Sequence, residues 1–394
     1  MSDRSLVHGT IAAGFESVRD EFTAVVTQQN EPGAQLAAYL NGTLVVDLWA
    51  GSEMQGDSLL ALYSSGKGAA YLVTALLTQD GVLDLDRPVA HLWPEFAAHG
   101  KDRITLRDLL AHRAGLVGVD GGFSTEELAD DHLIAQRLAG QRPFWPPGTA
   151  YGYHAFVVGA LVNEVVRRTT GQSIQQMYSD RIRDPYELDF YLGLPQALEC
   201  RYLPVQPLAP EQLARAEADL PDGNSLTGIA FNLNASSPTD LVAYANTRTV
   251  RAFGPTSSGS IGNARGLAKM YAATISPVDN REPLLRPGTL AEFTRRHATG
   301  IDLVTGERDH FLLGFEAQHS RYPFLSAGAF GHSGAVGAQS FADPRSGIAY
   351  SYTRRRFAYR GGGGAAENYR LATAVLAAAT ANSSPPSTNM RARR

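Results

Sequence analysis

The stretch Ser64-Ser65-Gly66-Lys67, continued by Gly68-Ala69-Ala70-Tyr71-Leu72-Val73, decides how the whole chain is interpreted. Its run of Ala, Leu and Val predicts a helix from Ser64 to Gln79, closed by Asp80-Gly81. Ser64 and Lys67 are three positions apart, so their side chains point the same way from the start of that helix. A serine hydroxyl becomes a nucleophile when a base is within hydrogen-bond reach, and a desolvated lysine amine can be that base.

Lysine is rare in this chain of 394 residues. Among its 35 basic residues the lysines are Lys67, Lys101 and Lys269, and of these only Lys67 has a serine three positions earlier. At ordinary serine frequencies, three lysines would give about 0.2 such pairs by chance. The pair is therefore a candidate catalytic pair. A solvated lysine near a helix cap is the alternative.

The composition excludes several classes of protein. With 44% hydrophobic and 19% charged residues the chain can bury a core and is not a disordered polymer. A net charge of −4 gives no sign of a nucleic-acid-binding surface. The single cysteine, Cys200, allows no intrachain disulfide and no thiolate metal cluster. No segment has the length of a signal peptide core or a membrane span, which favours a cytoplasmic protein.

Other catalytic signatures are missing from the sequence. It contains no His-Glu-x-x-His stretch and no Gly-x-Ser-x-Gly elbow, which argues against a metallohydrolase and an α/β-hydrolase. The glycine run at 361–364 lacks the Lys-Ser/Thr of a phosphate-binding loop and is expected to be a flexible loop. We therefore expect neither a metal nor a cofactor.

The two ends of the chain have strand patterns. Asn41-Gly42 between the apolar runs 34–40 and 43–50 predicts a hairpin, since both turn residues tolerate positive φ. Runs at 338–342 and 348–353, joined by a turn at 343–347, predict a second one. Helices are expected at 10–29 and 365–381, and also at 106–111 and 156–168, while the tract 203–224 is expected to be a long loop.

This order of elements predicts an α/β (α+β) architecture. Hairpins from both ends would form one sheet, covered by the first and last helices, with a helical unit inserted between them. We expect a discontinuous α/β lobe from residues 1–80 and 260–382, a mainly helical lobe from 81–259, and a disordered tail at 383–394. A site would lie in the cleft between the lobes.

Two further motifs follow the Ser-x-x-Lys pair. Acyl-transfer enzymes of this kind carry a later Ser/Tyr-x-Asn element and a Lys-Thr-Gly element. Here Tyr151-Gly152-Tyr153-His154-Ala155 opens a predicted helix, and Gly331-His332-Ser333-Gly334-Ala335 precedes a predicted strand. The order and the spacing of the three elements fit this pattern.

With these elements in place, the chain resembles the serine carboxylesterases of the class C β-lactamase and penicillin-binding protein superfamily, the branch often called family VIII esterases. The resemblance implies a β-lactamase/transpeptidase-like fold, an antiparallel sheet flanked by helices with an inserted helical lobe, and a Ser-Lys-Tyr acyl-transfer site. The matching stretches cover most of residues 8–380 and are Glu31–Gly51, Leu62–Glu95, Ile104–Leu116, Trp145–Gly171 and Phe330–Pro344.

The resemblance assigns roles to the first two elements. Ser64 is the nucleophile, Lys67 is the base or proton shuttle, and a tyrosine is the second proton-transfer group. The branch usually shows Gly-Tyr-His-Ala, which favours Tyr153 and leaves Tyr151 as the alternative beside the substrate. With either tyrosine, the Asn typical of β-lactamases is missing.

In the third element, His332-Ser333-Gly334 replaces Lys-Thr-Gly, as in many esterases of this branch. His332 can donate hydrogen bonds but does not guarantee the cation that a β-lactam carboxylate needs, and a strand-edge histidine is the plainer interpretation. The resemblance implies that the backbone N–H of Ala335 forms the oxyanion hole with that of Ser64.

Three other polar sites have plainer interpretations. His112 is expected to be structural, and His154 to line the pocket or to pack. The run Arg354-Arg355-Arg356 is expected to be a solvated strand end.

The expected function is hydrolysis of small-molecule carboxylic esters through a covalent acyl-enzyme. The main alternative is a transacylase, or amide-forming acyltransferase, in natural-product biosynthesis. A β-lactamase or DD-peptidase, and a non-catalytic binding scaffold, are less favoured. The expected partner is a small-molecule ester or amide, without nucleic acid or membrane.

Overall fold

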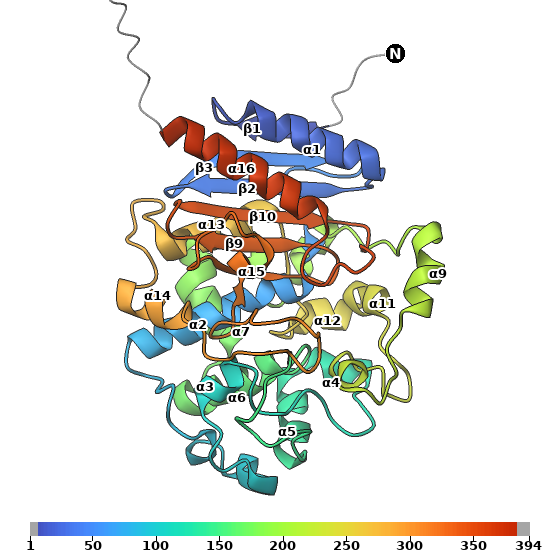
Figure 1. Ribbon diagram of the computed structural model, residues 1–394, viewed down its shortest axis with the longest axis vertical. Helices are drawn as coiled ribbons and strands as arrows, with labels where there is room; N and C mark the ends of the chain where they lie inside the picture. Colours follow the sequence, from blue (N-terminus) through green and yellow to red (C-terminus); the bar gives the residue numbers. More distant parts are fainter. Residues whose placement is uncertain (1–6, 384–394) are drawn as a thin grey trace, which may run out of the picture.

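The computed structural model describes residues 7–383, which are built around an antiparallel seven-stranded sheet (Figure 1). Its strand order is β1-β3-β2-β10-β9-β8-β7. Strands β2 and β10 pair at its centre, from Ala34↔Arg354 to Leu40↔Ile348, so the two ends of the chain share one sheet. The strands are β1 (Val7–Ile11), β2 (Ala34–Leu40), β3 (Thr43–Ala50), β7 (Glu316–Ala317), β8 (Phe330–Ser333), β9 (Gln339–Asp343) and β10 (Ile348–Arg354).

Both predicted hairpins are confirmed. Asn41 and Gly42 have φ of 49° and 81°, the left-handed backbone that an Asn-Gly turn provides at low cost. A Cβ on Gly42 would also lie 1.9 Å from the carbonyl oxygen of Pro277, so this turn sits tightly against the rest of the protein.

Two helices from opposite ends of the chain cover one face of the sheet. These are α1 (Glu16–Gln29) and α16 (Glu367–Ser383), which lie side by side in Figure 1. α1 buries an apolar stripe formed by Val18, Phe22, Val25 and Val26. α13 (Ala264–Ile275) packs against β2, β9 and β10.

The helix predicted from Thr10 was placed too early. Residues 7–11 form β1, which pairs with β3 from Val7↔Ala50 to Ile11↔Val46, and the helix begins at Glu16. The pairing is non-local, and periodicity within residues 10–29 cannot reveal it.

Helices predominate between the two hairpins. α2 (Lys67–Gln79) follows a 3₁₀ turn at Tyr63–Gly66 and is buried along most of its length. The predicted helices at 106–111 and 156–168 correspond to α3 (Leu106–Leu110) and α6 (Val158–Thr170). The further helices are α4 (Thr125–Ala129), α5 (Asp131–Gly140), α7 (Ile174–Tyr178), α8 (Asp184–Tyr186), α10 (Leu226–Ala230), α11 (Leu241–Asn246), α12 (Arg248–Phe253), α14 (Pro287–Phe293) and α15 (Gln318–Arg321). A small sheet has the order β4 (Leu60–Ala61), β6 (Ile261–Gly262) and β5 (Phe190–Tyr191).

Two sequence predictions need correction. The tract 203–224 is not entirely a loop, because α9 (Pro210–Ala218) lies within it, with Pro210 in its first turn where proline is tolerated. Two of the three arginines at the end of β10 are not solvated, and only Arg356 is partly exposed. Arg354 is buried between Glu31 (2.6 Å) and Glu367 (2.5 Å), and Arg355 is also buried.

The predicted tail at 383–394 lies outside the described residues, apart from the last residue of α16. The boundaries of the two lobes stay a prediction. No helix in residues 7–383 is both long enough and apolar enough to pass through a lipid bilayer.

Candidate active site

The start of α2 is held in place by an unusual turn. Tyr63, directly before Ser64, has a φ of +48°, a conformation that costs energy for a residue with a side chain. Its ring is buried and its hydroxyl donates to the carbonyl of Leu241 at 2.8 Å, while Ser260 donates to its backbone carbonyl at 2.9 Å. The strained turn therefore presents Ser64, which is half-buried, from a rigid support.

Ser64, Lys67 and Tyr153 form a closed triangle of hydrogen bonds. The Lys67 amine donates to Ser64 Oγ at 2.7 Å and to the Tyr153 hydroxyl at 2.9 Å. The Tyr153 hydroxyl donates to Ser64 Oγ at 2.8 Å. A third donation from Lys67, at 2.6 Å, goes to the carbonyl oxygen of Ser257. The structure thus brings together the serine, the lysine and one of the two tyrosines.

Burial changes the acid–base character of this triangle. Lys67 has no exposed surface, and desolvation of its ammonium form lowers its pKa well below the usual value. Burial raises the pKa of Tyr153, because the phenolate is the form that loses hydration. The lysine therefore becomes neutral more easily than in water, and the tyrosine stays protonated.

Tyr151 lies elsewhere, although it is only two positions from Tyr153. Its hydroxyl donates to the carbonyl of Gly300 and accepts from the backbone N–H of Asp309, both at 3.0 Å. The ring is 2% exposed. Tyr151 therefore holds the loop at 300–309 rather than facing Ser64.

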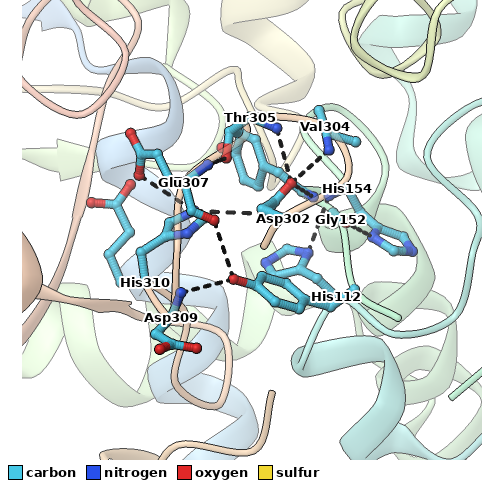
Figure 2. A network of polar contacts seen from close by, with 12 residues as sticks. His112, Gly152, His154, Asp302, Val304, Thr305, Glu307, Asp309 and His310 are labelled. Atoms are coloured by element: carbon cyan, nitrogen blue, oxygen red, sulfur yellow. Dashed lines mark hydrogen bonds and ion pairs between the residues drawn. The ribbon is translucent and has the colours of Figure 1, made fainter. Parts of the chain in front are cut away.

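Asp302 holds the backbone of Tyr153. One carboxylate oxygen accepts from the backbone N–H of Tyr153 (3.1 Å), Val304 (2.7 Å) and Thr305 (2.9 Å). Figure 2 shows this carboxylate between the backbone N–H groups of Val304 and Thr305 and the ring of His310, whose Nε2 lies 3.7 Å from the other oxygen. Desolvation raises the pKa of Asp302.

Two buried histidines, both labelled in Figure 2, contact the backbone on either side of Tyr153. His154 accepts from the backbone N–H of Leu116 through Nε2 (3.1 Å), and its Nδ1 contacts the carbonyl of Gly152 at 2.6 Å. His112 accepts from the backbone N–H of His154 at 3.2 Å. Burial lowers the pKa of His154 to about 4 and that of His112 well below its usual value. Both are neutral and structural, and neither lines the cleft at Ser64.

His332 is also buried and uncharged. It is 1% exposed, its Nδ1 contacts the carbonyl of Ser333 at 2.8 Å, and burial lowers its pKa to about 4. Its ring lies 5.9 Å from that of Tyr153, measured between ring centres. His332 therefore offers no cation to a ligand at neutral pH.

Ser333 and Gly334 connect the end of β8 to neighbouring segments of the protein. The Ser333 hydroxyl donates to Glu316 at 2.7 Å and accepts from the backbone N–H of Gly363 at 3.0 Å, so it faces the interior. A Cβ on Gly334 would lie 2.3 Å from the carbonyl oxygen of Leu62, so only glycine permits this approach to the turn before α2.

Ala335 is half-buried and lines a small cleft together with Ser64. None of the side chains that line it is charged, and its exposed surface is mainly apolar. The lining residues are Tyr63, Ser64, Ala155, Phe156, Phe231, Leu241, Ser258 and Ala335.

Several residues of the site carry no motif and were missed by the sequence prediction. Asp131 accepts from the backbone N–H (3.1 Å) and the hydroxyl (2.9 Å) of Thr256, and the next carbonyl, that of Ser257, receives Lys67. Asp302 and Glu316 are comparable cases. Isolated acidic residues outside any motif give no signal in a single sequence. Within residues 7–383, no cluster of three or more His, Cys, Asp or Glu could hold a metal ion.

Comparisons with known proteins identify the family of this chain. The family model described as Beta-lactamase matches residues 18–387. The Esterase/beta-lactamase LipL of Mycobacterium tuberculosis H37Rv is 28% identical over 365 residues, 89% of this chain and 83% of LipL. The structure of EstA from Arthrobacter nitroguajacolicus Rue61a is 38% identical with a TM-score of 0.87, covering 95% of this chain and 99% of EstA. The crystal structure of a family VIII carboxylesterase is 31% identical with a TM-score of 0.85, and the match covers 94% of this chain and 99% of the esterase. The expected β-lactamase/transpeptidase-like fold is thereby confirmed, and the chain belongs to the Beta-lactamase family.

Proposed function

We propose that the protein is a carboxylesterase that hydrolyses small-molecule esters through a covalent acyl-enzyme on Ser64. Its family makes it a serine hydrolase of the β-lactamase superfamily, and similar proteins are named esterase and carboxylesterase. The observation that carries the finer proposal is the closed triangle of Ser64, Lys67 and Tyr153.

In the acylation step Lys67 is neutral: its two N–H groups serve Tyr153 and Ser257, and its lone pair faces Ser64. The amine takes the hydroxyl proton of Ser64 as Oγ bonds to the ester carbonyl carbon. The backbone N–H groups of Ser64 and Ala335 stabilise the resulting oxyanion. When the carbonyl–alkoxide bond breaks, Tyr153 gives its proton to the leaving oxygen and recovers one from Lys67. The raised pKa of Tyr153 and the lowered pKa of Lys67 favour this division of roles.

In the deacylation step a water molecule attacks the acyl carbon. Lys67 takes the water's proton, and Ser64 Oγ leaves with a proton returned through the same triangle. An amine or an alcohol in place of water would give acyl transfer, which remains the alternative.

The lining of the cleft favours uncharged esters. A β-lactam carboxylate needs a cation, but His332 is buried and neutral, and no lysine or arginine is among the residues that line the cleft. Rapid hydrolysis of a β-lactam would contradict this part of the proposal.

The test is covalent trapping. Ser64→Ala should abolish ester hydrolysis and labelling by a serine-directed phosphonate, read by mass spectrometry of the intact protein. Ser65→Ala is the matched control: the Ser65 hydroxyl donates to the His332 carbonyl and takes part in no proposed step, so labelling should persist even if it becomes slower. Continued turnover by Ser64→Ala would refute the proposal. Adding amines to the trapped acyl-enzyme then separates hydrolysis from acyl transfer.

Two organisational points belong to the same proposal. The lobe division at 1–80 with 260–382 against 81–259 is supported by the pairing of β2 with β10. An intracellular location is supported by the single cysteine, which leaves no intrachain disulfide.

A further inference from the structure

We propose that Glu316 is a positioning residue for this reaction: it fixes the end of β8 beside Ser64 and supplies the negative charge that stabilises the Lys67 ammonium formed during acylation. This inference rests on the proposed function. The proposed role is electrostatic and structural, because Glu316 gains and loses no proton in any step.

Glu316 grips Ser333 at two points. One carboxylate oxygen accepts from the Ser333 hydroxyl at 2.7 Å, and the other accepts from the Ser333 backbone N–H at 3.1 Å. The second oxygen also accepts from Arg321 (2.7 Å) and from Gln318 (3.3 Å). Glu316 is 4% exposed, so water does not compete for these contacts.

Ser333 lies between two links to the start of α2. On one side, the carbonyl of His332 accepts from the Ser65 hydroxyl at 3.0 Å. On the other, Gly334 lies against the carbonyl of Leu62 and is followed by Ala335, which lines the cleft. Because Glu316 fixes the residue between these links, it fixes the distance between Ser64 and the proposed oxyanion-hole N–H of Ala335.

Glu316 is also ionised. Burial alone would raise the pKa of Glu316, but the guanidinium of Arg321, the ring of His332 and the hydrogen bond from Ser333 lower it to about 2. Arg321 is shared with Glu307, so it does not fully neutralise Glu316. The other titratable groups around Glu316 are His310 and His332, whose pKa values are lowered by burial, four tyrosines whose pKa values burial raises (Tyr71, Tyr153, Tyr271 and Tyr322), and Lys67.

The negative charge of Glu316 matters because Lys67 changes from a neutral amine to a cation during the reaction. His332 connects the two groups: its Nδ1 lies 3.4 Å from a carboxylate oxygen of Glu316, and its ring centre lies 5.9 Å from that of Tyr153, whose hydroxyl contacts Lys67. Before reaction the buried amine is driven towards neutrality, and the charge of Glu316 opposes this by raising the pKa of Lys67. Lys67 becomes a cation only when it takes the serine proton. An anion fixed nearby in a buried site therefore stabilises the transition state more than the starting state, which speeds the reaction.

The experiment compares Glu316→Gln with the original enzyme over a range of pH. The amide keeps the size of the side chain and an oxygen for Ser333 but removes the charge. We expect kcat/KM to fall on the order of ten- to a hundredfold. We also expect the acidic limb of its pH profile to shift to lower pH, because Lys67 stays neutral to lower pH. A loss of rate without any shift of the limb would overturn the electrostatic role.

Glu307→Gln is the matched control, since Glu307 also contacts Arg321 but is 39% exposed and does not touch Ser333. The acidic limb of the pH profile should move much less in Glu307→Gln than in Glu316→Gln. If Glu316→Gln does not fold, as judged by thermal unfolding, Glu316→Asp takes its place. It keeps the charge and shortens the reach to Ser333, so the rate should fall while the limb stays near its original pH. An unchanged rate would overturn the positioning role.

Phosphonate labelling and activity of Ser64→Ala, measured beside the Glu316 variants, separate the proposed function from the inference about Glu316. If Ser64→Ala retains activity, the proposed function fails whatever Glu316 does. If Ser64→Ala is inactive and the Glu316→Gln limb does not move, only the inference about Glu316 fails.

Discussion

Residues 63–67 and residues 300–316 both hold Tyr153, but at opposite ends and with different groups. The first segment contacts the tyrosine hydroxyl through Ser64 and Lys67, which take part in the proposed chemistry. The second holds its backbone N–H through Asp302, and at Glu316 it holds the strand that follows. Two of the three reacting groups thus come from a short contiguous motif, whereas the third, Tyr153, and strand β8 are positioned by buried carboxylates outside any motif.

The two carboxylates of residues 300–316 position the site in the same way, by accepting a hydrogen bond from a backbone N–H group. Asp302 and Glu316 each accept from the backbone of a residue in a recognised motif, Tyr153 and Ser333. Asp131 acts similarly on Thr256, next to the carbonyl that receives Lys67. A carboxylate that accepts several N–H groups is a strong and directional anchor. We therefore expect substitutions in residues 63–67 to abolish catalysis, and substitutions of the carboxylates in residues 300–316 to lower the rate without abolishing it.

The largest effect is expected at Lys67. Lys67→Met should lower kcat by roughly a thousandfold or more, because nothing else in the triangle can take the serine proton. Stopped-flow or steady-state kinetics of ester hydrolysis measure the fall in kcat. Lys101→Met is the control, since Lys101 is equally buried but donates to the Gln141 carbonyl far from this motif. That variant should unfold at lower temperature and keep its kcat. Equal loss of kcat in both would mean that buried lysines matter only for folding.

The two tyrosines sharpen the comparison further. Tyr153→Phe should lower kcat about a hundredfold, because the proton for the leaving group is lost. Tyr151→Phe should leave kcat within a few fold and cost about 1 kcal/mol of stability, because it loses the bonds to Gly300 and Asp309. Kinetics and thermal unfolding of both variants provide the measurement. A larger kinetic loss for Tyr151→Phe would reverse the assignment.

How much could be predicted from sequence depends on how local each feature is. The Asn41-Gly42 turn and the Ser64–Lys67 spacing are local, and both predictions match the structure. β1 and the burial of Arg354 depend on partners far along the chain, and both were predicted wrongly. The choice between Tyr151 and Tyr153 depended on the loop at 300–309, which has no motif of its own. Long-range pairing and isolated buried acids leave no periodicity or spacing to detect.

The smallest effect is expected at Asp302, and it should show as a slope of stability with pH. Burial raises its pKa above the value of 3.8 that a free carboxyl has, so the folded protein keeps this proton to higher pH than the unfolded chain. As pH rises from 3.8 through the raised pKa, this group therefore subtracts stability. Asp302→Asn cannot ionise and should remove that slope, with a net change of about 1 kcal/mol at neutral pH and a loss of kcat of a few fold.

Glu316 contributes a slope of the opposite sign, and Glu316→Gln removes it, which provides the contrast. The pKa of Glu316 is lowered to about 2, so its contribution to stability is fully present above 4.5 and is lost as pH falls towards 2. Chemical denaturation at a series of pH values measures both variants against the original protein. The slopes should have opposite signs although the two carboxylates lie in one segment, because Arg321 faces Glu316, whereas the second oxygen of Asp302 has only the weakly basic His310 nearby. Slopes of the same sign would mean that burial alone, and not the facing charge, governs these carboxylates.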